Sequence, residues 1–147
     1  MMIKKFMKNG FVSFMCFMLM MVFATAIVYA KAETVNTYYS FACSTTSRSH
    51  EASSTPTVTV TTSNMIGNPS DKLWVEVEKK YWYGWAAPGS NNSSKQVSSV
   101  YGSKFSLKGN GSGTYRLLFG KSSMLLSGQY NTKSSKWYSD LKIYYNH

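Results

Sequence analysis

The most chemically distinctive part of the sequence is a short aromatic run, residues 81–85, which follows two lysines. Strand alternation cannot bury both faces of this run if one face of its sheet is solvated, so some rings should be exposed. Exposed aromatic rings stack on sugars or anchor at a lipid interface, and the lysines would add positive charge. If the rings instead close the end of a core, no binding site remains here. The candidate ligand-binding residues are Tyr81, Trp82, Tyr83, Trp85, Lys79 and Lys80.

Residues that could catalyse a reaction or hold a metal form no recognisable pattern. Glu76 and Glu78 share one face of a predicted strand, about 7 Å apart by strand rise, which could suit paired glycosidase carboxylates. Because lysines follow directly, the two acids also fit a solvated strand face, and we favour that interpretation. His50 and His147 show neither metal-ligand nor triad spacing. We therefore predict no catalytic residue, no metal site, no cofactor and no enzymatic activity.

The first 32 residues have the three parts of a secretory signal peptide. Three lysines within residues 4–8 form the positive region, residues 11–28 are an apolar run, and residues 30–32 read Ala-Lys-Ala. A cut two residues earlier, or an uncleaved membrane anchor, are the alternatives. The sequence therefore predicts a signal peptide at 1–32 and a secreted, extracellular domain at 33–147.

Secretion also decides how Cys43 is interpreted. It is the single cysteine after residue 32, so it has no disulfide partner in its own mature chain. We predict a buried thiol that acts as a small apolar side chain, and an intermolecular disulfide is the alternative.

Positive charge is distributed unevenly along the chain. The formal charge is +10, from 16 Lys and Arg against 6 Asp and Glu, and residues 1–32 supply four of those lysines. Residues 33–147 carry +6, and the last 53 residues contain seven lysines against one acid. A cationic exterior attracts anionic polymers or membranes, although lysines can also serve solubility alone. Because lysine predominates over arginine and the protein is predicted to be exported, we expect no nucleic-acid binding.

From residue 33 onward the apolar residues alternate with a period of two, which predicts strands rather than helices. The strand candidates are residues 56–63, 72–83, 96–101, 103–108, 114–120, 124–131 and 136–145. Residues 44–55 and 84–95 are predicted loops, and residues 109–113 a glycine-rich turn. Seven to eight short strands predict an all-β fold, a single antiparallel β-sandwich or a small barrel. The predicted inward-facing residues are Val58, Val60, Leu73, Val75, Val77, Val97, Phe105, Leu107, Tyr115, Leu117, Phe119, Trp137, Leu141 and Ile143.

One stretch resembles a known class of module. Residues 105–119 place a glycine-rich turn before a strand of the form G-x-Y-x-L-x-F, in which the last position is Phe119. This stretch is similar to the late strands of small secreted bacterial β-sandwich modules of Gram-positive type, such as pre-peptidase C-terminal modules. The resemblance implies a non-catalytic extracellular module and assigns no site residue. The acidic strand of calcium-binding relatives has no counterpart here.

These features together predict a secreted, non-catalytic binding module for an anionic cell-wall polymer or a carbohydrate. The alternative is a secreted cationic bacteriocin-like or membrane-active toxin that acts on an anionic membrane surface. Export, positive charge and aromatic residues are common to both hypotheses.

Overall fold

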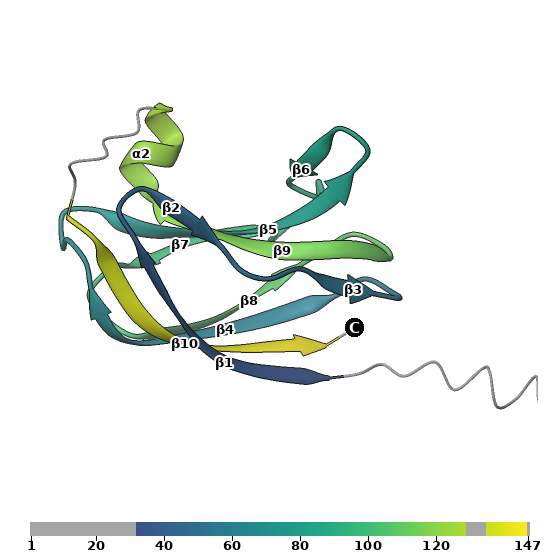
Figure 1. Ribbon diagram of the computed structural model, residues 1–147, viewed down its shortest axis with the longest axis horizontal. Coiled ribbons are helices and arrows are strands. Elements are labelled where there is room, and N and C mark those ends of the chain that lie inside the picture. The colour runs from purple at the N-terminus through teal and green to yellow at the C-terminus, as the bar shows by residue number, and fades with distance from the viewer. Residues whose placement is uncertain (1–31, 129–134, 147) are drawn as a thin grey trace, which may run out of the picture. The chain divides into compact units, whose positions relative to one another are not determined.

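The computed structural model describes residues 32–128 and 135–146, which form two antiparallel β-sheets packed face to face (Figure 1). The all-β sandwich predicted from the sequence is confirmed. The predicted signal peptide lies, except for Ala32, outside the described residues. Within the described part of the chain, no helix has the length and apolar character needed to cross a membrane.

The first sheet, sheet A, has four strands in the order β1-β10-β4-β8. Its strands are β1 (Glu33–Phe41), β4 (Thr57–Ile66), β8 (Ser103–Lys108) and β10 (Trp137–Asn146). β10 lies between β1 and β4 and is antiparallel to both, so the last described strand is held in the sheet on both sides.

The second sheet, sheet B, is built around two long central strands, β5 (Lys72–Tyr81) and β9 (Gly113–Lys121). Two short strands, β2 (Ser44–Thr46) and β3 (His50–Ala52), pair with the far side of β9. Two more, β6 (Gly84–Ala86) and β7 (Ser94–Ser98), pair with the far side of β5. This pairing gives β5 the central position from which most candidate site residues project.

The core lies between the two sheets and follows the predicted alternation. Of the predicted inward-facing residues, all except Val97 are buried, and Val97 packs against the core while partly exposed. Tyr39, Phe41 and Tyr145 complete the core from β1 and β10. Because side chains of a strand alternate between faces, these inward residues fix which side chains of the same strands point to solvent.

The strand predicted at residues 124–131 is wrong in its described part, because the helix α2 (Ser122–Ser127) lies there. Met and Leu are good helix formers, and the helix ends at Gly128, whose φ is +66°. Tertiary contacts hold this helix on the sheet. Ser123 donates two hydrogen bonds to the Asp71 carboxylate, and Leu125 packs so closely on Gly120 that a Cβ there would lie 2.5 Å from its Cδ1.

The loops predicted at residues 44–55 and 84–95 are wrong in part, since they contain β2, β3, β6 and the start of β7. Three of these strands are three residues long, too short for an alternating pattern to be recognised. They form because β5 and β9 offer them free edges. Cys43 lies in the bend between β1 and β2 and is half-buried rather than fully buried.

Candidate functional site

The aromatic run forms the tip of the β5–β6 hairpin. Tyr81 is paired with Gly84 across the hairpin, so Trp82 and Tyr83 are the two turn residues. Gly84 has a φ of +130°, a conformation that glycine adopts readily and other residues rarely do. Figure 1 shows this hairpin and α2 standing on the side of sheet B that faces away from sheet A, near opposite ends.

Two of the three rings at the tip are exposed, and both Tyr81 and Trp82 contact the Tyr83 ring. Trp82 is 96% exposed and Tyr83 61% exposed, whereas Tyr81 is half-buried. The Tyr81 and Tyr83 rings are parallel within 1°, with centroids 5.3 Å apart. The Trp82 ring meets Tyr83 edge-on, at 90° and 5.3 Å. The tip therefore presents an apolar surface to solvent and does not close the core.

The two lysines before the run point to opposite faces of β5. Lys79 shares the inward register with Val77, and its ammonium donates a hydrogen bond to the Asn110 carbonyl at 2.8 Å. The same ammonium lies 5.6 Å from the centre of the Tyr115 ring. Lys80 is exposed and directly opposite Trp85. Of the two lysines, Lys80 is therefore the one that adds charge beside the exposed aromatic rings.

A second group of large side chains lies on the outer face of sheet B, and we call it the outer-face cluster. Its members are Trp74, Glu76, Glu78, Trp85 and Arg116, all half-buried. Arg116 Nε donates to Glu78 Oε2 at 2.7 Å, and its guanidinium lies 4.3 Å from the centre of the Trp85 ring. Trp74 Nε1 donates to Glu76 Oε2 at 2.9 Å. Three strands, β5, β6 and β9, thus contribute to one polar and aromatic surface.

The outer-face cluster corrects our interpretation of Glu76 and Glu78. The two acids do share a face, as the alternation predicts, but neither is a freely solvated surface acid that depends on the following lysines. Glu78 is paired with Arg116 on β9, 38 positions away in sequence, and Glu76 with the Trp74 indole. Sequence reasoning missed Arg116 because its position opposite Glu78 follows from the β5–β9 register. The signal available in the sequence was the alternation of Trp74, Glu76 and Glu78, which places these three side chains on one face of the strand.

Lys121 shows that the lysine-rich C-terminal part is not uniformly a cationic exterior. It is 4% exposed, donates to the Ser135 carbonyl at 2.6 Å and lies 5.0 Å from the centre of the Trp137 ring. Its burial lowers the pKa of the ammonium. The exposed lysines in the described part of this region are Lys95, Lys104, Lys108, Lys136 and Lys142, and Lys133 lies outside the described residues.

A cavity of about 730 Å³ lies between β1 and the short strands β2 and β3. His50 is on its wall, stacked on Tyr145 with ring centroids 3.9 Å apart, and its Nδ1 is 3.5 Å from Glu33 Oε2. Among the residues that the structure describes, no group of three or more His, Cys, Asp or Glu side chains could hold a metal ion.

Comparisons with known proteins find a distant structural likeness. No protein-family model matches the chain, and no curated protein matches it in sequence. Among solved structures, the fold is similar to a chain from the structure of the infectious bursal disease virus Gx strain, with a TM-score of 0.42 and 10% identity. The likeness covers 80% of this chain and 33% of the viral chain.

Proposed function

We propose that residues 33–147 act as a secreted, non-catalytic module that binds a carbohydrate or an anionic polymer of the cell envelope. The observation that carries this proposal is the exposure of the hairpin tip, where Trp82 is 96% and Tyr83 61% exposed. Burying an exposed indole against a ligand releases apolar surface from water, and the flat ring can stack on the apolar face of a sugar.

The arrangement of the tip suits it for contact with a partner. Parallel Tyr81 and Tyr83 rings support each other, so the tip loses little conformational freedom on binding. Lys80 lies on the adjoining strand and would attract an anionic group. The resemblance of residues 105–119 to secreted β-sandwich modules agrees with this role.

Sedimentation with purified bacterial cell walls tests the proposal. We expect Trp82→Ala to weaken binding by roughly tenfold or more, as loss of a central aromatic anchor does at other interfaces. Tyr101→Ala is the matched control, because Tyr101 is an exposed aromatic residue of another turn, 76% exposed, and should leave binding unchanged. Equal binding by the wild type and Trp82→Ala would contradict the proposal.

A membrane-active toxin is the second candidate, and the almost complete exposure of Trp82 on a projecting hairpin favours it. Indole rings are enriched at lipid interfaces, and Lys80 would meet anionic headgroups. Leakage of dye from anionic phosphatidylglycerol vesicles separates the two candidates. The toxin hypothesis requires leakage that Trp82→Ala abolishes, whereas a wall-binding module leaves the vesicles intact.

A further inference from the structure

We propose that the outer-face cluster of sheet B is a binding surface for a neutral, hydroxyl-rich glycan. The inference rests on the binding role proposed above and narrows its ligand from a carbohydrate or polyanion to an uncharged carbohydrate. The glycan would lie along β5, between Trp74 and the hairpin that carries Trp85.

The cluster has the length that an oligosaccharide requires. Trp85 is opposite Lys80 in the β5–β6 register, and Lys80 is six positions after Trp74 on the same face of β5. The backbone positions that carry the two indoles are therefore about 20 Å apart along the strand. The rings themselves are closer together, because Trp74 contacts Glu76 and the Trp85 ring lies against Arg116. Glu76, Glu78 and Arg116 occupy the face between them, and α2 and the hairpin stand near its two ends (Figure 1).

The hydrogen-bonding groups of the cluster are only partly used. Within the described residues, hydrogen bonds reach Oε2 of Glu76, Oε2 of Glu78 and Nε of Arg116. The two Oε1 atoms and the two Nη groups have no partner in that part of the chain. These groups are half-buried but face the solvent side of the sheet. A ligand at this surface would therefore meet acceptors and donors side by side.

This mixture of acceptors and donors selects the chemistry of the ligand. A carboxylate only accepts hydrogen bonds, and a guanidinium only donates them. A sugar hydroxyl does both, so neighbouring hydroxyl groups can donate to Glu76 and Glu78 and accept from Arg116. A phosphate diester or a sulfate only accepts, so it could bind Arg116 but would be repelled by the two carboxylates.

The local charge leads to the same ligand class. Glu76 and Glu78 are balanced by Arg116 and Lys80, so the centre of this face is neutral although residues 33–147 carry +6. The face therefore has no net attraction for a polyanion, and its affinity should depend little on salt.

The side chains are held in place before any ligand arrives. The Arg116–Glu78 ion pair and the Trp74–Glu76 hydrogen bond orient four of the five members of the cluster. Their side chains lose little rotamer freedom on binding, which lowers the entropic cost. The Arg116–Glu78 pair also joins β5 to β9, so a test must separate binding from stability.

Retention on insoluble chitin, insoluble cellulose and dextran sulfate coupled to polyacrylamide beads tests the inference. We expect retention on at least one neutral glycan, changed less than about twofold when NaCl rises from roughly 50 to 500 mM. Glu76→Gln should weaken that retention about tenfold, because a hydroxyl group loses a charged acceptor. Glu33→Gln, the matched removal of an exposed acid from β1, should leave it unchanged.

Arg116→Lys is the second variant, because it keeps the positive charge but removes the planar donor groups. We expect it also to weaken glycan retention about tenfold. Thermal unfolding of both variants shows whether the fold survives, and Glu76→Gln keeps an acceptor for the Trp74 indole.

The possible results separate this inference from the proposed function. Retention on dextran sulfate alone, with loss in Trp82→Ala, leaves the binding role standing and overturns the neutral-glycan inference. A gain of retention in Glu76→Gln also overturns it, since removing a carboxylate would then favour an anionic ligand. Unchanged glycan retention in both folded variants places the ligand elsewhere and rejects the cluster. Retention on none of the three matrices overturns the neutral-glycan inference, and sedimentation with purified cell walls then decides whether the binding role stands.

Discussion

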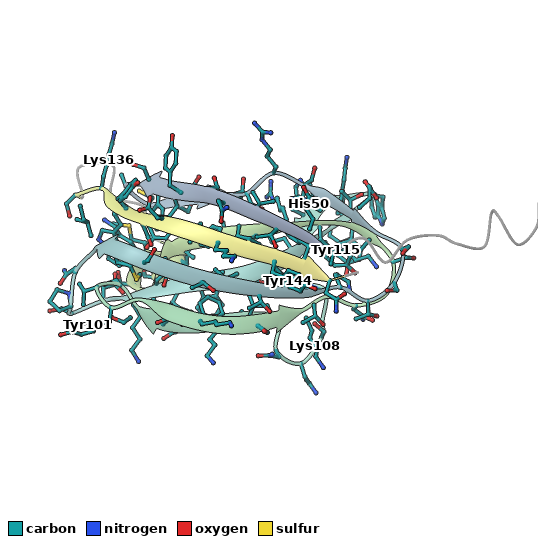
Figure 2. All side chains as sticks on the ribbon, turned by 90° about the horizontal axis from the view of Figure 1, so that it is seen from below. His50, Tyr101, Lys108, Tyr115, Lys136 and Tyr144 are labelled. Atoms are coloured by element: carbon teal, nitrogen blue, oxygen red, sulfur yellow. The ribbon has the colours of Figure 1, made fainter. Side chains whose placement is uncertain are left out.

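The outer faces of the two sheets differ in the kind of side chain they present. Sheet A presents hydroxyl residues, tyrosines of β1 and β10, and lysines, with Lys142, Thr61 and Lys104 in one row across three strands. Sheet B presents two indoles, two carboxylates and a guanidinium that contact one another. Figure 2 looks onto sheet A, with Tyr144 near the end of β10 and Lys108 at the margin of the sheet.

The outer face of sheet A is largely solvated, whereas the large side chains on the outer face of sheet B are held by contacts with their neighbours. On sheet A the hydroxyls of Thr59 and Ser106 share a hydrogen bond at 2.8 Å, and both lysines of the row are exposed. Near the start of β10 the centre of the Tyr138 ring lies 5.8 Å from that of the Tyr38 ring, and the Tyr138 hydroxyl donates to Asp140 Oδ1. Exposed lysines keep their rotamer freedom and contribute little to stability. On sheet B the large side chains are half-buried and restrained by partners. The row of exposed lysines and the proposed binding surface therefore lie on different faces.

The largest expected effect concerns the core that both faces share. Phe119 on β9 contacts Tyr39 on β1, with ring centroids 5.7 Å apart, so it joins the two sheets. Phe119→Ala should lower the free energy of unfolding by about 3–5 kcal/mol, measured by urea denaturation. Leu126→Ala, at a residue that is 66% exposed, should change it by less than about 0.5 kcal/mol. A loss below about 1 kcal/mol for Phe119→Ala would mean that the sheets do not depend on this contact.

Alkaline pH should weaken sheet A in particular. Burial raises the pKa of Tyr39 and of Tyr145 from 10.0 to about 12. Each tyrosine is thus harder to ionise in the folded chain, so its stabilising contribution is complete below pH 10.0 and is lost as pH rises towards 12.

The expected loss is about 2–3 kcal/mol for each tyrosine. Urea denaturation at a series of pH values from about 9 to about 12 measures this loss. The series spans the ordinary tyrosine pKa of 10.0 and the raised value of about 12. Tyr39→Phe and Tyr145→Phe should each flatten the decline. The same slope in all three proteins would show that other groups cause it.

Removing the guanidinium of Arg116 tests the outer face of sheet B. We expect an intermediate loss in the free energy of unfolding. Arg116→Ala leaves Glu78, whose side chain is 13% exposed, without its cation and should cost about 1–2 kcal/mol. A double-mutant cycle with Glu78→Gln isolates the energy of the pair. Additive effects of the two substitutions would indicate that the pair contributes nothing beyond its separate side chains.

The smallest effect is expected on sheet A. Lys142→Ala and Lys104→Ala should each change the free energy of unfolding by less than about 0.5 kcal/mol and leave glycan retention unaltered. Circular dichroism melts and the same retention assay check both statements. If the double variant loses retention, the face of sheet A takes part in binding and the contrast between the two faces disappears.

The fold was largely predictable because local alternation and burial agree. The strands β4, β5, β8, β9 and β10 each contain a run of apolar residues at alternate positions, and a strand with this pattern has one stable way to face a core. The three-residue strands have no such pattern, and α2 has too few apolar residues for their spacing to distinguish a helix from a strand.

The sequence by itself determined that the domain is all-β, which residues form most of its core, and that an aromatic run stands at the end of a strand. These are consequences of residue type and of spacing along the chain. Only the tertiary structure decided that Trp82 and Tyr83 are exposed, that the Lys79 ammonium binds the Asn110 carbonyl, and that Arg116 meets Glu78 and Trp85. Those relations depend on strand register and sheet order, which bring together residues whose separation in sequence carries no signal.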